Sequence, residues 1–135
     1  MNVKSLDHIH IGCRDVERAL GYYRRHFQAK DVAVLKNIHG QALTLIDVGG
    51  KVLALSDFPP GVELPATAPD PDAAREGVSR GGVMHLGINV EDVVAAVTEL
   101  RAAGEPIHAE PVTAEGVTFA YVEAPDGVLI ELTQY

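Results

Sequence analysis

The chain contains little sulfur and few aromatic side chains. Among its 135 residues there is one cysteine, Cys13, no tryptophan, and only four tyrosines and three phenylalanines. A single thiol excludes an intramolecular disulfide and a structural zinc site built from thiolates. Cys13 lies just before a predicted helix N-terminus, and we interpret it as a buried structural thiol rather than a nucleophile.

Basic residues and long apolar runs are also scarce. The chain contains 11 Lys and Arg residues and 19 Asp and Glu residues, so its net charge is −8. This excess of negative charge disfavours nucleic acids and anionic membranes as partners, because both would be repelled. No segment approaches the roughly 18 apolar residues of a membrane span, and residues 1–7 lack the apolar stretch of a signal peptide. The sequence therefore predicts a cytoplasmic protein.

The chain does contain an internal repeat with an offset of 77 residues. His8 corresponds to His85 and Asp15 to Asp92, and the segments 50–56 and 127–133 also match. A repeat of this kind predicts two similar modules related by a pseudo-twofold axis. We expect one domain over residues 1–135, with modules at about 4–58 and 82–135 joined by a proline-rich linker at about 59–81.

Each module is expected to have the order βαβββ, which makes the fold α+β. The two helices carry matching apolar stripes, and Asp15 and Asp92 are suitable N-caps for them. In the first strand, His8 and His10 share one face. The expected strands are 6–11, 32–36, 42–48 and 51–56, then 84–90, 107–112, 117–123 and 128–133; the expected helices are 16–27 and 93 to about 103, with a short linker helix near 73–76.

Four special positions of the repeat point to a metal site. Positions 8, 85 and 131 hold His8, His85 and Glu131, whereas position 54 holds Ala54. If the repeat folds symmetrically, all four face one concavity, and a buried carboxylate such as Glu131 needs a cation or strong donors. Two imidazoles and a carboxylate form the set that holds Fe(II) and also suits Mn, Co, Ni or Zn. The alternative for either histidine alone is a hydrogen-bonded core residue, and the shared register favours the metal.

Other polar residues are candidates for the same cavity. Tyr121, whose repeat partner is Thr44, could donate a hydrogen bond to a substrate oxygen, or it could be a core tyrosine. His10 could act as an acid or base beside His8, or simply pack there. We expect Ser56 and Thr133, which are repeat equivalents, to line the pocket. His39 is interpreted as a turn residue, and His26 and His108 as surface residues.

Several motifs carry a resemblance to a known family. Leu6-Asp-His8, Tyr22-Tyr23, Gly82-Val-Met-His85-Leu and Pro125-Asp-Gly127-x3-Glu131 resemble the vicinal oxygen chelate superfamily of glyoxalases, bleomycin-resistance proteins and extradiol dioxygenases. The resemblance implies paired βαβββ modules that form a cupped mixed sheet around a divalent metal, often in a homodimer. It also implies His8, His85 and Glu131 as the metal ligands.

The chain departs from this family at Ala54. Glyoxalase I and methylmalonyl-CoA epimerase have Glu or Gln there, and alanine can neither bind a metal nor carry a proton. Extradiol dioxygenases and fosfomycin-resistance thiol transferases use three ligands. The segment from Tyr121 to Glu131 matches the C-terminal half of the extradiol pattern, but its upstream histidine is missing. The basic phosphonate-binding residues of the fosfomycin proteins have no counterpart near 109–115.

The sequence thus predicts a divalent-metal enzyme that binds a small substrate through vicinal oxygens. Fe(II) or Mn(II) is favoured, with Ni, Co or Zn as alternatives. Dioxygenase-like chemistry ranks slightly ahead of a lyase or isomerase that acts through a metal-bound enediolate, in which Glu131 would serve as the base. A metal-free, ligand-sequestering protein is the rival, although it would suit a chain richer in aromatic residues.

Overall fold

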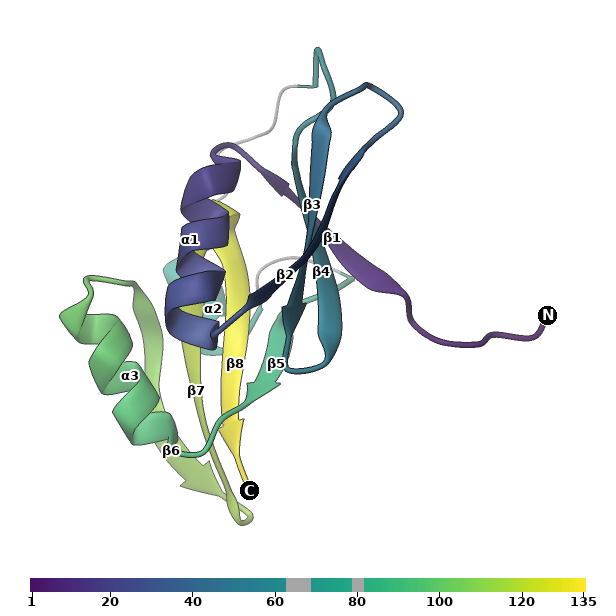
Figure 1. Cartoon of the computed structure of the whole chain (residues 1–135). Helices are drawn as coiled ribbons and strands as arrows, with labels where there is room; N and C mark the ends of the chain where they lie inside the picture. The colour runs from purple at the N-terminus through teal and green to yellow at the C-terminus, as the bar shows by residue number, and fades with distance from the viewer. Residues whose placement is uncertain (63–68, 79–81) are drawn as a thin grey trace. The chain divides into compact units, whose positions relative to one another are not determined.

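The computed structural model describes residues 1–62, 69–78 and 82–135. It consists of two compact units, unit 1 from Met1 to Leu64 and unit 2 from Pro65 to Tyr135. Each unit contains a four-stranded mixed sheet and a long helix (Figure 1). The predicted α+β fold of tandem βαβββ modules is therefore confirmed.

Unit 1 has the sheet order β1-β4-β3-β2, in which β1 runs parallel to β4 and the other neighbours are antiparallel. Helix α1 packs against β4. The apolar residues Ile11, Ile46, Leu53 and Leu55 are buried, and they share one face of the sheet by its register. The elements are β1 (His8–Cys13), α1 (Val16–Phe27), β2 (Lys30–Lys36), β3 (Ala42–Val48) and β4 (Lys51–Asp57).

Unit 2 repeats this arrangement with the order β5-β8-β7-β6 and a parallel β5–β8 pair. Helix α3 buries Val93, Val97 and Leu100 and packs against β6, β7 and β8, while α2 packs against β6. The elements are α2 (Pro71–Arg75), β5 (Leu86–Asn89), α3 (Val93–Ala102), β6 (Ile107–Ala114), β7 (Val117–Ala124), a 3₁₀ turn (Pro125–Gly127) and β8 (Val128–Gln134).

Both long helices begin at the predicted aspartates. The carboxylate of Asp15 accepts a hydrogen bond from the amide of Arg18, and that of Asp92 accepts one from Ala95, each at 2.9 Å. An aspartate at this position satisfies one of the amides that the first helical turn leaves without a partner. The predicted bounds of 16–27 for the first helix and 42–48 for the third strand are confirmed.

Two strands begin later than the sequence predicted. β1 starts at His8 rather than residue 6, and β5 starts at Leu86 rather than residue 84. The parallel partners set these limits, because β5 pairs with β8 only from Leu86 to Asn89. His85 therefore immediately precedes its strand instead of lying within it.

The offset of 77 residues does not hold for β3 and β7. Glu131 pairs with Tyr121 in unit 2, and the equivalent Ala54 pairs with Leu45 in unit 1. The counterpart of Tyr121 is thus Leu45, and its predicted pairing with Thr44 is wrong. The cause is turn length: three residues separate β7 from β8, whereas two separate β3 from β4. Because of the one extra turn residue, the residue of β7 that lies 77 positions after a residue of β3 faces the other side of its sheet.

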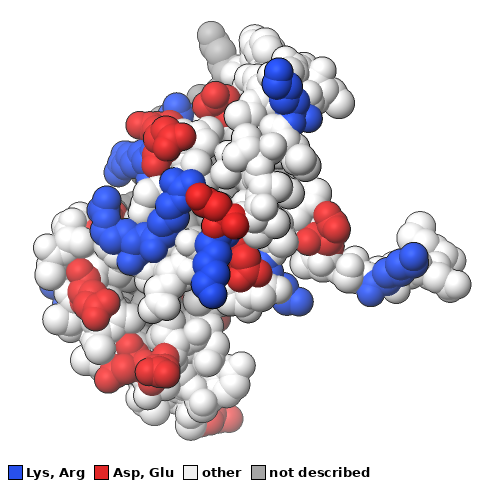
Figure 2. All heavy atoms as spheres, in the orientation of Figure 1, with Lys and Arg blue, Asp and Glu red and all other residues white. Residues whose placement is uncertain are grey.

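On the face shown in Figure 2, acidic and basic side chains are interspersed. The net charge of −8 is therefore not gathered into one acidic area on that face. None of the helices formed by the described residues combines the length and the hydropathy that a membrane crossing requires.

Candidate functional site

Three of the predicted site residues meet in unit 2: His85, Tyr121 and Glu131, which we call the unit 2 cluster. Tyr121 on β7 and Glu131 on β8 are directly paired, so their side chains leave the sheet on the same face. The side chains of His85 and Glu131 are 24% and 25% exposed, and the nearest atoms, Nε2 and Oε2, lie 3.5 Å apart. The cluster is thus half-buried and still reachable from solvent.

A backbone carbonyl fixes the proton on His85. Its Nδ1 lies 2.8 Å from the carbonyl oxygen of Gly77, just beyond α2. A carbonyl oxygen only accepts hydrogen bonds, so Nδ1 must carry the hydrogen. In the neutral ring, Nε2 then has a lone pair, and that lone pair lies on the side of Glu131.

Tyr121 holds the other oxygen of the carboxylate. Its hydroxyl donates a hydrogen bond of 3.2 Å to Oε1 of Glu131, which leaves Oε2 for a second partner. Burial raises the pKa of the Tyr121 hydroxyl above its ordinary value of 10.0, and the charge and hydrogen bond of Glu131 and the charge of Glu76 raise it further. Tyr121 therefore remains a hydrogen-bond donor at neutral pH.

Gly77 also allows the tyrosine to occupy this position. Its φ angle is +72°, and a Cβ atom built there would lie 2.5 Å from Cζ of Tyr121. Real Cβ atoms do not approach carbon that closely, so only glycine fits beneath the ring. One residue of the linker thus contacts two members of the unit 2 cluster.

In unit 1, His8 has the same proton arrangement as His85. Its Nδ1 lies 2.7 Å from a carboxylate oxygen of Asp7. An ionised carboxylate only accepts, so Nδ1 carries the hydrogen, and in the neutral ring Nε2 has the lone pair. The His8 side chain is 41% exposed, which leaves its ring accessible.

His10 lies beside His8, with 6.5 Å between the ring centroids. Its Nε2 is 2.8 Å from Oγ of Ser56, and that hydroxyl donates to the carbonyl of Asp57. Because Ser56 has only one hydrogen to give, Nε2 of His10 must be the donor and its Nδ1 has the lone pair. The adjacent Ala54 is fully buried and offers only a methyl group.

Within the described parts of the chain, no three His, Cys, Asp or Glu side chains are grouped closely enough to hold a metal. The structure brings His85 and Glu131 together in unit 2, and it places His8 and His10 together in unit 1. Ser56 is buried on the face of His10, and the backbone carbonyl of Thr133 accepts a hydrogen bond from the side-chain amide of Asn89. That both residues line a pocket stays a prediction.

The prediction that His108 is a surface residue is wrong. Its Nε2 lies 2.6 Å from Oε2 of Glu123, and the two side chains are only 15% and 19% exposed. The repeat could not reveal this pair, because it exists in one unit only. The available signal was strand alternation, which puts Glu123 on the face of Tyr121. His26, also predicted at the surface, is half-buried against the ring of Tyr22.

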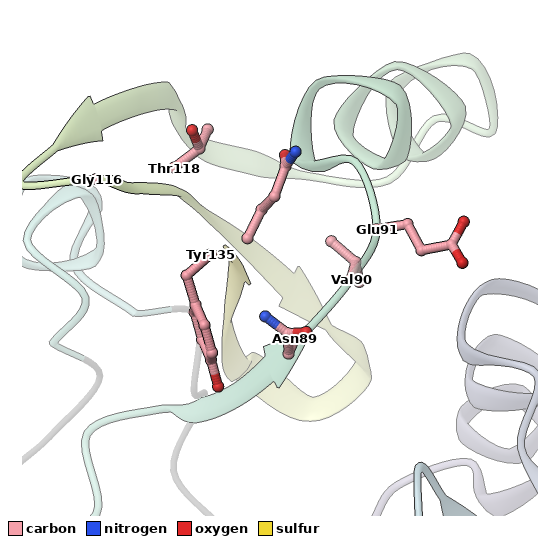
Figure 3. A pocket seen from close by; sticks show the side chains of 7 residues that line it. Asn89, Val90, Glu91, Gly116, Thr118 and Tyr135 are labelled. Carbon is pink, nitrogen blue, oxygen red and sulfur yellow. The ribbon is translucent and has the colours of Figure 1, made fainter.

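A hollow of about 550 Å³ lies elsewhere in unit 2, at the end of β8 (Figure 3). It contains no member of the unit 2 cluster, and Glu91, its one charged residue, points away from it in the view. We therefore do not assign the candidate site to it. Its lining residues are Asn89, Val90, Glu91, Gly116, Thr118, Gln134 and Tyr135.

Comparison with known proteins agrees with the resemblance seen in the sequence. The sequence model of the Glyoxalase/Bleomycin resistance protein/Dioxygenase superfamily matches residues 5–132. The uncharacterized protein YwkD of Bacillus subtilis (strain 168) is 31% identical over 98% of both chains. A probable lactoylglutathione lyase of Vibrio cholerae serotype O1 is 40% identical over 52 residues, 37% of this chain and 38% of that protein.

The same fold occurs in a crystal structure of the fosfomycin resistance protein FosX from Listeria monocytogenes in complex with Mn(II) and a sulfate ion. The TM-score is 0.69 at 12% identity, over 99% of this chain and 94% of that one. At this identity the similarity concerns the fold alone.

Proposed function

Because the chain belongs to the Glyoxalase/Bleomycin resistance protein/Dioxygenase superfamily, we propose that it is a divalent-metal enzyme that binds a small substrate through two adjacent oxygen atoms. The proposed ligands are His8 of unit 1 with His85 and Glu131 of unit 2. A homodimer in the cytoplasm is part of the same proposal.

The protons on the two histidines support this proposal most strongly. His8 and His85 both donate from Nδ1, to the Asp7 carboxylate and the Gly77 carbonyl respectively. Metal-binding histidines in proteins are usually held in this way, with the second nitrogen left for the metal. His85 Nε2 and Glu131 Oε2 are 3.5 Å apart, so both atoms could bind one metal ion.

When bound, a divalent metal would supply Lewis-acid stabilisation of negative charge on a substrate oxygen. The chain's own residues have separate roles. Tyr121 holds Oε1 of Glu131 and thereby directs Oε2 toward His85. Ala54 adds no ligand, so three protein ligands would leave positions open for the two substrate oxygens.

For the reaction, we place proton transfer next to a carbonyl group first and Fe(II)-dependent oxygen chemistry second. The sequence alone ranks these classes in the opposite order by a narrow margin. The partial match to a probable lactoylglutathione lyase supports the change, as does His10, whose Nδ1 lone pair can accept a proton. The Mn(II) complex of FosX makes Mn(II) the first metal to test.

Isothermal titration of the metal-stripped chain with Mn(II) tests the proposal. We expect one Mn(II) per chain, and we expect His8→Ala, His85→Ala and Glu131→Ala each to weaken binding by more than about tenfold. His39→Ala is the matched control, because His39 lies in an exposed turn. Circular dichroism should show that every variant stays folded.

Two results would revise the proposal. Failure of the native chain to bind Mn(II), Fe(II), Ni(II), Co(II) or Zn(II) would overturn it and favour a metal-free, ligand-sequestering protein. If His85→Ala lost the metal and His8→Ala did not, His8 would be removed from the ligand set.

A further inference from the structure

The His108–Glu123 pair is a second group of titratable side chains in unit 2. Its hydrogen bond of 2.6 Å joins β6 to β7, and both side chains are mostly buried. The ion pair between Glu110 on β6 and Arg101 on α3 is different, since these side chains are 70% and 51% exposed. An ion pair on the surface needs no function, whereas taking charged groups out of water is costly.

The pair lies on the same face of the sheet as the unit 2 cluster. Glu123 is two residues from Tyr121 on β7, so the two side chains share a face. Tyr121 is paired with Glu131 and Glu123 with Leu129, which makes Glu123 and Glu131 diagonal neighbours. Diagonal residues on adjacent strands are about 7–8 Å apart at their Cα atoms. A small substrate can span this distance.

An irregularity in β6 adds to this arrangement. The register between β6 and β7 shifts between Ile107 and Ala109, and His108 is the extra residue. Ala109 is paired with Tyr121, and His108 contacts Glu123, so both side chains lie on the cluster's face. Bulges of this kind re-aim a side chain and are over-represented next to active sites.

The carboxylate determines which nitrogen of His108 can react. Ionised Glu123 accepts the hydrogen of Nε2, so Nδ1 of the neutral ring has the lone pair. In the described parts of the chain, Nδ1 has no hydrogen-bond partner. The helices packed against β6 also carry charged groups: Asp72, Arg75 and Glu76 on and just after α2, and Glu99 and Arg101 on α3. Glu131 lies on β8, diagonally across from Glu123.

We infer that His108 is a catalytic residue that exchanges a proton with the substrate, and that Glu123 positions it. The inference rests on the proposed function, and it names the substrate class: a compound with a C–H bond next to a carbonyl and an adjacent hydroxyl. The C–H bond breaks, the proton goes to Nδ1, and the electron pair forms an enolate whose oxygen carries the charge. The proton then returns to carbon, so no oxidant or reductant is needed.

The test is deuterium uptake by hydroxyacetone in D₂O, followed by mass spectrometry with the Mn(II)-loaded chain. We expect uptake above the rate with Mn(II) alone, and a loss of about 100-fold or more in His108→Gln. Glu123→Gln should lose about tenfold, and Glu123→Asp should recover part of it. Glu110→Gln on the same strand is the control and should match the native chain.

Mn(II) titration of the same variants separates this inference from the proposed function. If His108→Gln binds Mn(II) and keeps native uptake, or if the native chain binds Mn(II) without uptake, the inference is overturned and the metal site stands. If the native chain binds no metal, the proposed function fails.

A second test uses the metal-free chain. The ¹⁵N spectra of the His108 ring should show hydrogen on Nε2, and Glu123→Gln should lose that preference. Hydrogen on Nδ1 in the native chain would overturn the inference.

Discussion

Gly77 contacts two residues of the unit 2 cluster, His85 and Tyr121. Adding a Cβ atom at Gly77 should therefore destabilise the folded chain. We predict that Gly77→Ala lowers the free energy of unfolding by about 2–4 kcal/mol, from the positive φ and from the clash with the Tyr121 ring. Gly82→Ala is the control, because Gly82 also has a positive φ but no atom of the described residues lies within 4 Å of its Cβ position. Urea denaturation should show a loss of only about 1 kcal/mol for Gly82→Ala. Equal losses would show that the ring is not held by Gly77.

The Tyr121 hydroxyl gives a second prediction for single residues. In the metal-stripped chain its pKa lies above the ordinary value of 10.0, and the difference between the ultraviolet titrations of the native chain and Tyr121→Phe should show this hydroxyl ionising above that value. Glu131→Gln removes a negative charge and should lower the Tyr121 pKa. Between the Tyr121 pKa of the unfolded chain and that of the folded chain, only the unfolded chain loses the proton. The free energy of unfolding therefore falls as pH rises above about 10. Tyr121→Phe should remove the contribution of this hydroxyl and make the fall smaller.

The sequence identified His85, Tyr121 and Glu131 as site residues, and the structure brings them together. The sequence alone could not identify Gly77 or His108. The contact of Gly77 with Tyr121 depends on how the linker folds back on the sheet, and no periodicity describes that. The His108 side chain is placed by an irregular pairing of two strands, which depends on tertiary contacts rather than on local residue types.

At the scale of helices and strands, both helix starts were predictable, because the aspartate caps act within four residues of sequence. We predict that Asp15→Ala and Asp92→Ala each lower the free energy of unfolding by about 1 kcal/mol in urea denaturation. Asp15→Ala should cost more, since Gln134 also accepts a hydrogen bond from Val93 in the first turn of α3. A larger cost for Asp92→Ala would show that the Gln134 contact does not limit fraying of α3.

The register of the central strands was less accessible from sequence. The similar sequences around Gly50 and Gly127 indicated one constant offset, but the two turns differ by one residue in length. The length of a strand connection sets which side chains face each other across the pair. This is why Tyr121 corresponds to Leu45, and why unit 1 has an apolar residue where unit 2 has a hydroxyl.

For the whole molecule, binding of the proposed metal should stabilise the folded chain. With metal at 100 times its dissociation constant, the free energy of unfolding should rise by about 2.7 kcal/mol. His39→Ala should keep this gain, whereas His8→Ala and His85→Ala should lose it. Thermal or urea denaturation with and without a chelator measures the difference. A gain that survives in both ligand variants would place the metal elsewhere.

The position of Cys13 has a practical consequence for the whole chain. The thiol is 1% exposed at the end of β1, in unit 1, and unit 2 contains no cysteine. An alkylating reagent can therefore reach it only when unit 1 opens. The rate of labelling, followed by intact-mass spectrometry, therefore measures how often unit 1 opens, and no engineered probe is needed.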